Sequence, residues 1–98
     1  MIRKLTSACL IAAAALLTVT ALAKTSTESA CKSYAQNAVN DYHVMVKHEK
    51  CRVADSGRWQ PNYENHYNWC VTAPTGWRLA EAKKRDAHLK RCGARYSL

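Results

Sequence analysis

The sequence predicts an all-α fold: a small three-helix bundle stapled by two disulfides. Apolar residues recur at three- and four-residue steps in three segments, and breaks rich in glycine and proline separate these segments. Four cysteines follow an N-terminal leader at nearly even intervals. No segment alternates polar and apolar residues with the period of two typical of a half-buried strand. We therefore expect mostly antiparallel helices over residues 26–50, 61–72 and 77–92, and no sheet.

The first 23 residues have the pattern of a cleaved signal peptide. Arg3 and Lys4 precede the apolar run 10–17, and the small residues at the end of the segment fit a cleavage site after Ala23. The apolar run is shorter than the ~20 residues that a membrane span needs, so we expect no membrane span in the mature chain. The mature chain, residues 24–98, is then a single small domain, periplasmic or secreted, with a formal charge of +6.

The first predicted helix has a start signal and one apolar face. Thr25 and Glu28, three positions apart, match a capping box. The apolar and aromatic residues that follow at helical spacing are Tyr34, Ala35, Ala38, Val39, Tyr42, Met45 and Val46.

The second and third predicted helices also have recognisable ends. Pro61 suits the first turn of a helix, because its missing N–H would have no partner there. Gly93 is placed to stop the last helix. The inner faces are predicted to carry Tyr63, Tyr67 and Cys70 in the second helix, and Ala82, Leu89 and Cys92 in the third.

The four mature cysteines, Cys31, Cys51, Cys70 and Cys92, are 20, 19 and 22 positions apart. Each interval holds about one helix and its turn, so the cysteines mark helix ends. Three connectivities are open to four cysteines. Antiparallel first and third helices would place Cys31 beside Cys92 and Cys51 beside Cys70, and we favour that pairing. No pair has the short Cys-x-x-Cys spacing of a zinc site, so we expect neither metal nor cofactor.

Four aromatic residues and a histidine lie in the eleven positions that end at Trp69. Because the chain has no phenylalanine, Trp59, Tyr63 and Tyr67 are expected to supply the core, with a binding surface as the alternative. Trp69 falls off the apolar stripe of its helix and is expected to be more exposed. With Arg58 nearby, such a ring can stack on a sugar or hold a cation.

Other candidate chemical groups have simpler structural interpretations. His66 and Cys70 are one helical turn apart and would suit a metal only if Cys70 were free. Glu81 and Arg85 are four apart in the order that favours a local ion pair, with Arg85 partly inward. No phosphate loop, nucleophile elbow or metalloprotease motif is present, so we expect no enzymatic activity.

Basic residues fill the last third of the chain. They are Arg78, Lys83, Lys84, Lys90, Arg91 and Arg95. A solvated helix face is the simpler interpretation. The alternative is an anionic docking surface, whose candidate binding residues are Lys84, His88 and Arg91, together with Arg58 and Trp69.

Export and positive charge together restrict the partner. Nucleic acid is a poor fit to an exported protein, so an anionic envelope polymer or an acidic protein is expected instead. The predicted function is a small, non-catalytic binding or accessory module of the cell envelope. The alternative is a secreted effector or enzyme inhibitor, in which disulfides give resistance to proteases.

A set of residues spans nearly all of the mature chain: Cys31, Tyr34-Ala35, Ala38-Val39, Gly57, Arg58-Trp59, Tyr63, His66, Trp69-Cys70, Glu81, Arg85, Leu89 and Cys92. In these features the chain resembles an uncharacterised four-cysteine helical module of exported bacterial proteins. The resemblance implies a self-contained helical unit and transfers no catalytic residue.

Overall fold

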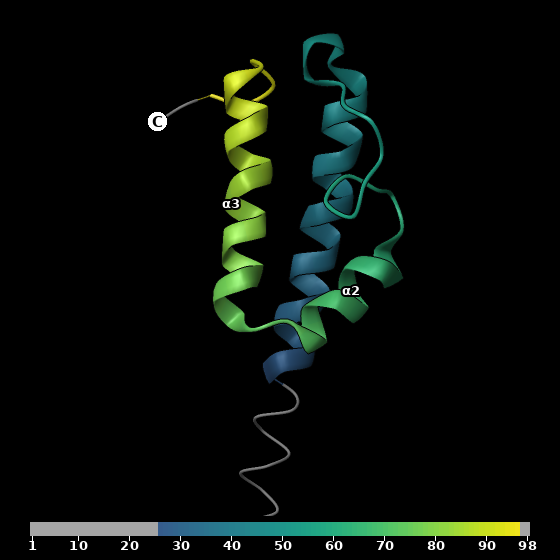
Figure 1. Cartoon of the computed structure of the whole chain (residues 1–98), viewed down its shortest axis with the longest axis vertical. Coiled ribbons are helices and arrows are strands. Elements are labelled where there is room, and N and C mark those ends of the chain that lie inside the picture. Colours follow the sequence, from purple (N-terminus) through teal and green to yellow (C-terminus); the bar gives the residue numbers. More distant parts are fainter. Residues whose placement is uncertain (1–25, 97–98) are drawn as a thin grey trace, which may run out of the picture.

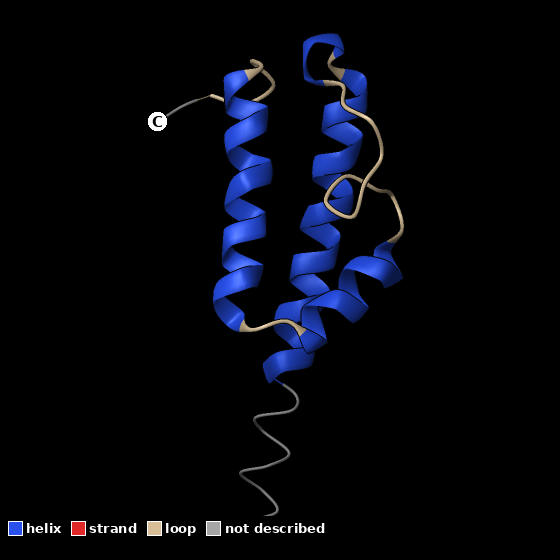
Figure 2. Ribbon diagram, viewed as in Figure 1, coloured by secondary structure: helices blue, strands red, loops and turns tan. Residues whose placement is uncertain are grey.

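The computed structural model describes residues 26–96 and contains three α-helices in that range, with no strand there (Figures 1 and 2). The first helix covers residues 26–47. It is followed by a single 3₁₀ turn, η1 (Glu49–Cys51), and by helices α2 (Tyr63–Thr72) and α3 (Thr75–Arg91). The predicted all-α, disulfide-stapled three-helix fold is confirmed. The predicted leader, residues 1–23, lies outside the described residues, as does Thr25 of the predicted capping box.

The starts of α2 and α3 each differ by two residues from the predicted positions. Asn62 caps α2, because its side-chain Oδ1 accepts a hydrogen bond from the Asn65 backbone N–H at 3.1 Å. Pro61 therefore precedes the cap and does not begin the helix. α3 starts at Thr75, earlier than predicted, because the carbonyl of Pro74 accepts hydrogen bonds from the first turn.

The first helix and α3 run parallel, whereas the sequence predicted them to be antiparallel. Figure 1 shows both long helices starting at the same end, with α2 lying obliquely across it. Contacts between them rise in sequence number on both sides: Cys31 contacts Arg78 and Asp41 contacts Arg85. Just beyond the ends of the two helices, Cys51 is bonded to Cys92. The chain returns along the first helix through residues 52–62, which contain no helix. Because this return is not helical, the next long helix points the same way as the first.

The disulfides join Cys31 to Cys70 and Cys51 to Cys92, so the favoured pairing was wrong. In the parallel arrangement, Cys31 lies at the end where α2 finishes, and Cys92 lies at the opposite end beside Cys51. The Cα–Cα distances of 5.6 and 5.2 Å lie in the usual range for disulfides. The two bonds still clamp opposite ends of the bundle, as the helix-length spacing predicted.

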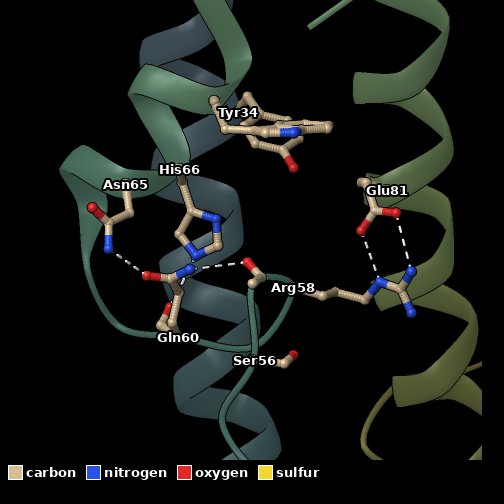
Figure 3. Close-up of a pocket in the computed structure, with 9 residues that line it drawn as sticks. Tyr34, Ser56, Arg58, Gln60, Asn65, His66 and Glu81 are labelled. Atoms are coloured by element: carbon tan, nitrogen blue, oxygen red, sulfur yellow. Dashed lines mark hydrogen bonds and ion pairs between the residues drawn. The ribbon is translucent and has the colours of Figure 1, made fainter.

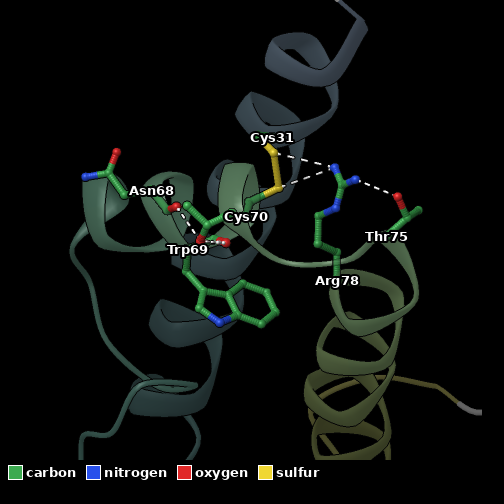
Figure 4. The surroundings of a disulfide bond; sticks show 7 residues. Cys31, Asn68, Trp69, Cys70, Thr75 and Arg78 are labelled. Atoms are coloured by element: carbon green, nitrogen blue, oxygen red, sulfur yellow. Dashed lines mark hydrogen bonds between the residues drawn. A yellow bond between two sulfur atoms is a disulfide. The ribbon is translucent and has the colours of Figure 1, made fainter. Parts of the chain in front are cut away.

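Arg78, predicted to lie on a basic surface, instead contacts the first disulfide (Figure 4). Its Nη1 lies 3.6 and 3.7 Å from the sulfurs of Cys31 and Cys70, and its Nη2 donates to Thr75 Oγ1 at 2.7 Å. This guanidinium therefore ties the start of α3 to the junction between the first helix and α2.

The apolar core is small and lies between the first helix, the return segment and α3. Its buried cluster consists of Met45, Cys51, Trp59 and Leu89. The predicted aromatic core is only partly present: Trp59 is buried, whereas Tyr63 and Tyr67 stack on each other with ring centroids 6.2 Å apart and Tyr63 is exposed. The buried side chains of α2 are His66 and Cys70.

Beside this core, Arg85 is buried with 1% of its surface exposed. Its Nε donates to Asp41 Oδ2 at 3.3 Å and its Nη1 to the Tyr34 hydroxyl at 3.2 Å. Asp41 also accepts from Arg95. The inward position of Arg85 was predicted, but its expected ion pair with Glu81 is not formed. Instead, Arg58 donates two hydrogen bonds to Glu81. Such a two-bond pair is stronger than an ion pair between residues one helical turn apart.

Gly93 ends α3 as the sequence predicted. Its φ is +89°, its N–H bonds the Lys90 carbonyl at 3.2 Å, and the Ala94 N–H bonds the Leu89 carbonyl at 2.8 Å. These are the two hydrogen bonds of a Schellman motif.

Replacing Gly93 with alanine should lower the free energy of unfolding by about 1 kcal/mol, because an L residue is strained at this φ. A Cβ at this position would have no atom within 4 Å, so the cost comes from the backbone alone. Gly76→Ala is the matched control: its site is equally open, its φ is not positive, and it lies inside α3. Urea denaturation should show no loss for Gly76→Ala; equal losses for both variants would contradict the explanation.

Candidate functional site

A cavity of about 510 Å³ opens between α2, the return segment, the first helix and α3 (Figure 3). This volume is within the range of small-molecule sites. Its walls combine aromatic, amide and charged side chains. They come from Tyr34, Ser56, Gly57, Arg58, Gln60, Asn65, His66, Trp69 and Glu81.

The loop that forms one wall is held by its own hydrogen bonds. The Ser56 N–H donates to the Trp59 carbonyl at 2.9 Å, and the Trp59 N–H donates to Ser56 Oγ at 3.2 Å. Gln60 Nε2 donates to the Gly57 carbonyl at 3.1 Å. Because the Trp59 ring is buried in the core, this turn is fixed to the body of the protein and presents Arg58 to the cavity.

Arg58 and Glu81 form an ion pair across the cavity, from the loop to α3. Arg58 Nε and Nη2 donate to the two carboxylate oxygens at 2.7 and 3.0 Å. Lys84 Nζ lies 3.5 Å from Glu81 Oε1. The hydrogen bonds from Arg58 hold the pKa of Glu81 below its ordinary value. Glu81 is therefore a fixed carboxylate, available as an acceptor.

His66 places a neutral imidazole in the opposite wall. Its Nε2 lies 2.9 Å from the Gln60 carbonyl, which can only accept, so Nε2 carries the hydrogen. Burial lowers the pKa of His66, although the bond to Gln60 opposes this, and the nearby charge of Arg85 lowers it further. The other nitrogen, Nδ1, is then an unprotonated acceptor.

Two aromatic rings form the third wall. Tyr34 and Trp69 have ring centroids 5.6 Å apart and planes inclined by 34°. The guanidinium of Arg85 lies over the Tyr34 ring, 4.9 Å from its centroid, and its Nη1 also donates to the Tyr34 hydroxyl. Trp69 is half-buried, and it lies at the cavity next to Cys70 of the first disulfide.

Three of the five predicted binding residues are brought together here. Arg58 and Trp69 line the cavity, and Lys84 lies at its edge beside Glu81. His88 lies elsewhere: its Nε2 contacts the Cys51 carbonyl at 2.7 Å and its ring packs on Trp59. Arg91 is exposed near the end of α3 and has no ion pair among the described residues.

Sequence reasoning missed Tyr34 as a site residue, because it falls on the apolar stripe of the first helix. It also treated His66 and Glu81 as structural groups. The signal that could have found them is the set of resemblance features, six of which line the cavity: Tyr34, Gly57, Arg58, His66, Trp69 and Glu81.

No family model, curated protein or solved structure matches this chain. Within residues 26–96, no group of three or more histidine, cysteine or acidic side chains is placed to hold a metal ion. No helix in that described range has the length and hydropathy needed to cross a bilayer.

Protonation of His66 should lower the free energy of unfolding in weak acid. Its folded-state pKa is lowered from about 6.5, so the unfolded chain binds the proton more tightly. The stability contributed by neutral His66 is fully present above pH 6.5 and is lost as the pH falls through the folded-state pKa. Between pH 7.5 and 5, Tm should fall less in His66→Gln than in the wild type, whereas exposed His43→Gln is the control and should follow the wild type. Parallel curves for the wild type and His66→Gln would contradict this assignment.

Proposed function

We propose that the protein is a small, non-catalytic binding module of the cell envelope, which engages an anionic envelope polymer through the Trp69 cavity and the basic side chains beside it. The observation that carries the proposal is the cavity itself. It joins an aromatic wall to fixed hydrogen-bonding groups, with Arg58 and Lys84 at its margin. Such a combination is typical of sites that bind and orient a ligand.

The charge of α3 supports attraction to an anion, but not through a continuous basic face. Lys84 pairs with Glu81, and Lys90 pairs with Asp86. Arg95 binds Asp41 and Asp86. Among the described residues, only Lys83 and Arg91 of the six basic residues singled out by the sequence have neither an ion pair nor another polar contact. The positive charge therefore draws an anion toward the protein, while the cavity supplies the contacts that hold it.

The chemistry of the cavity supports binding over catalysis. A proton donor needs a pKa near the working pH, but the pKa of Glu81 is lowered by Arg58. The Nε2–H of His66 is held by the Gln60 carbonyl. The Ser56 hydroxyl accepts from the Trp59 backbone, and no base contacts it within the described residues. These groups are fixed in one state, which suits recognition.

The proposal is tested by retention of the purified exported protein on polygalacturonate, an anionic polysaccharide, with uncharged dextran as the control. We expect binding to polygalacturonate that weakens as salt is raised. Trp69→Ala should weaken it about tenfold, the loss of one ring contact and its buried area. Trp77→Ala is the matched control, because this ring is 64% exposed and lies outside the cavity.

Three results would overturn the proposal. They are no salt-sensitive retention on polygalacturonate, equal losses from Trp69→Ala and Trp77→Ala, and retention on an acidic protein without retention on the polysaccharide. Reversing the charge with Lys83→Glu should shift elution to lower salt, because Lys83 has no ion pair within residues 26–96 that would compensate the change.

A further inference from the structure

We infer that the cavity takes the uncharged part of a pyranose unit of a polysaccharide, its hydroxyls and its C–H face, and that the anionic groups of the polymer stay outside the cavity, near Lys84. This inference rests on the proposed function and deepens it by naming the group that enters the cavity. The reasons lie in the hydrogen-bonding groups left open there and in the aromatic wall.

The open groups of the cavity are a balanced set of donors and acceptors. Tyr34 accepts from Arg85, so its O–H is left to donate. The indole N–H of Trp69 has no partner among the described residues, and neither has Arg58 Nη1. On the acceptor side are His66 Nδ1 and the remaining lone pairs of Glu81.

This balance favours hydroxyl groups over ions. A hydroxyl both donates and accepts, so a ring carrying several can satisfy Glu81 and His66 while accepting from Tyr34 and Trp69. A carboxylate or phosphate only accepts, and would face the fixed carboxylate of Glu81 and the lone pair of His66. An amine only donates, and would lie among the positive charges of Arg58 and Arg85. Either ion would bury groups without partners, which is costly.

The aromatic wall fits the apolar face of the same ligand. In Figure 3, Tyr34 lies across the open space from Glu81, and the Trp69 ring packs on Tyr34 with ring centroids 5.6 Å apart. A pyranose has C–H groups on its ring faces and hydroxyls around its edge. Its C–H face can pack on the electron-rich face of Trp69 while its hydroxyls reach His66 and Glu81.

The site is also pre-organised for this ligand. Hydrogen bonds from Arg58 hold the Glu81 carboxylate in place. A hydrogen bond from Arg85 holds Tyr34, and the Gln60 carbonyl orients His66. The amide of Asn65 donates to Gln60 Oε1 at 2.8 Å and completes the wall. Because these groups are held before binding, little conformational freedom is lost when a sugar enters.

The chain carries its own reporters for the test. It has three tryptophans, Trp59, Trp69 and Trp77, whose indole N–H signals can be resolved by ¹H–¹⁵N NMR and assigned with single Trp→Phe variants. The protein is titrated with the neutral probes cellotetraose and chitotetraose, with glucose and N-acetylglucosamine as single-unit probes, and with anionic tetragalacturonate.

We expect cellotetraose or chitotetraose to shift the Trp69 indole signal and leave that of Trp77 unchanged. Binding of the neutral probe should change less than about twofold between roughly 0.05 and 0.5 M salt, since no net charge is neutralised. Tighter binding of a tetrasaccharide than of its single unit identifies a unit within a chain, whereas equal binding identifies a free sugar; both support a pyranose in the cavity.

Two variants distinguish a loss of ligand binding from a loss of folding. Trp69→Phe keeps a ring but loses the N–H, and should weaken the neutral probe several-fold. Glu81→Gln keeps the shape and loses the charge, and should weaken it by a similar factor, since a carboxylate is the stronger acceptor. Thermal unfolding confirms that each variant is folded at the temperature of the titration, and Trp77→Phe is the control.

The outcomes distinguish the two proposals. If no neutral probe moves Trp69 but polygalacturonate still binds with salt sensitivity, the pyranose inference is overturned and the proposed function stands. If neither the neutral probes nor polygalacturonate bind, both fail. A shift at Trp77 in place of Trp69, or entry of tetragalacturonate with a shift that no neutral probe produces, also overturns the inference.

Discussion

Asp41→Ala should lower the free energy of unfolding by about 3 to 5 kcal/mol, because it leaves a buried guanidinium without its counter-charge. Arg85 is 1% exposed, and its Nη2 already lacks a hydrogen-bond partner among the described residues. Within the part of the chain that the structure describes, removing the Asp41 carboxylate would leave only the Tyr34 hydroxyl and ring to stabilise this cation. Urea denaturation at pH 7 should show the loss as a lower midpoint with an unchanged m value.

Asp86→Ala is the matched control for this prediction. Asp86 also binds Arg95, but its side chain is 40% exposed. Exposed pairs are worth little, so removing Asp86 should lower the free energy of unfolding far less than Asp41→Ala does. Replacing both partners, with Asp41→Leu and Arg85→Met, should recover much of the loss, since no charge is then left buried. Equal effects of Asp41→Ala and Asp86→Ala would refute the buried network as a major source of stability.

Removing the Cys31–Cys70 disulfide, with both cysteines replaced by alanine, should cost about 4 kcal/mol and open the cavity. The bond closes a loop with a sequence separation of 39, which sets the entropic part of this estimate. Tyr34 lies one helical turn after Cys31, and Trp69 directly precedes Cys70. Without the bond, nothing covalent holds the two rings of the aromatic wall together. Near-ultraviolet circular dichroism at low temperature should lose the signal of the packed rings.

The second disulfide provides the control. Cys51–Cys92 has a sequence separation of 41, so its removal should cost nearly the same free energy. It lies at the other end of the bundle, and the Tyr34–Trp69 contact should persist in the folded variant. Peptide mass mapping of the wild type checks the pairing itself. Detection of Cys31 joined to Cys92 would contradict both the pairing and the parallel helices.

The helices were predictable because their information is local. Apolar residues at helical spacing gave the first helix and α3 to within a few residues, and Gly93 gave the end of α3. Even the inward position of Arg85 followed from its place on an apolar stripe. The prediction that the tyrosines of α2 supply the core was wrong: His66 is buried there, and Tyr63 is exposed. Tyr63 and Tyr67 cover part of each other's rings by stacking, so they can remain at the surface.

The candidate site was less predictable because its contacts are distant in sequence. Arg58 and Glu81 are 23 positions apart, and Tyr34 and Arg85 are 51 apart. Neither pair produces a periodic pattern in the sequence. Sequence spacing favoured a local ion pair between Glu81 and Arg85. In the structure, Glu81 instead accepts two hydrogen bonds from Arg58 of the loop.

The sequence by itself determined an all-α chain with helices of the observed order and with cysteines at helix ends. Only the tertiary structure decided the direction of α3, the pairing of those cysteines and the groups that share a cavity. The reason is the segment 52–62, which carries no helical or strand period and yet brings the chain back along the first helix. Its path is set by long-range contacts, those of buried Trp59 and of Arg58 with Glu81, and such contacts exist only once the chain has folded.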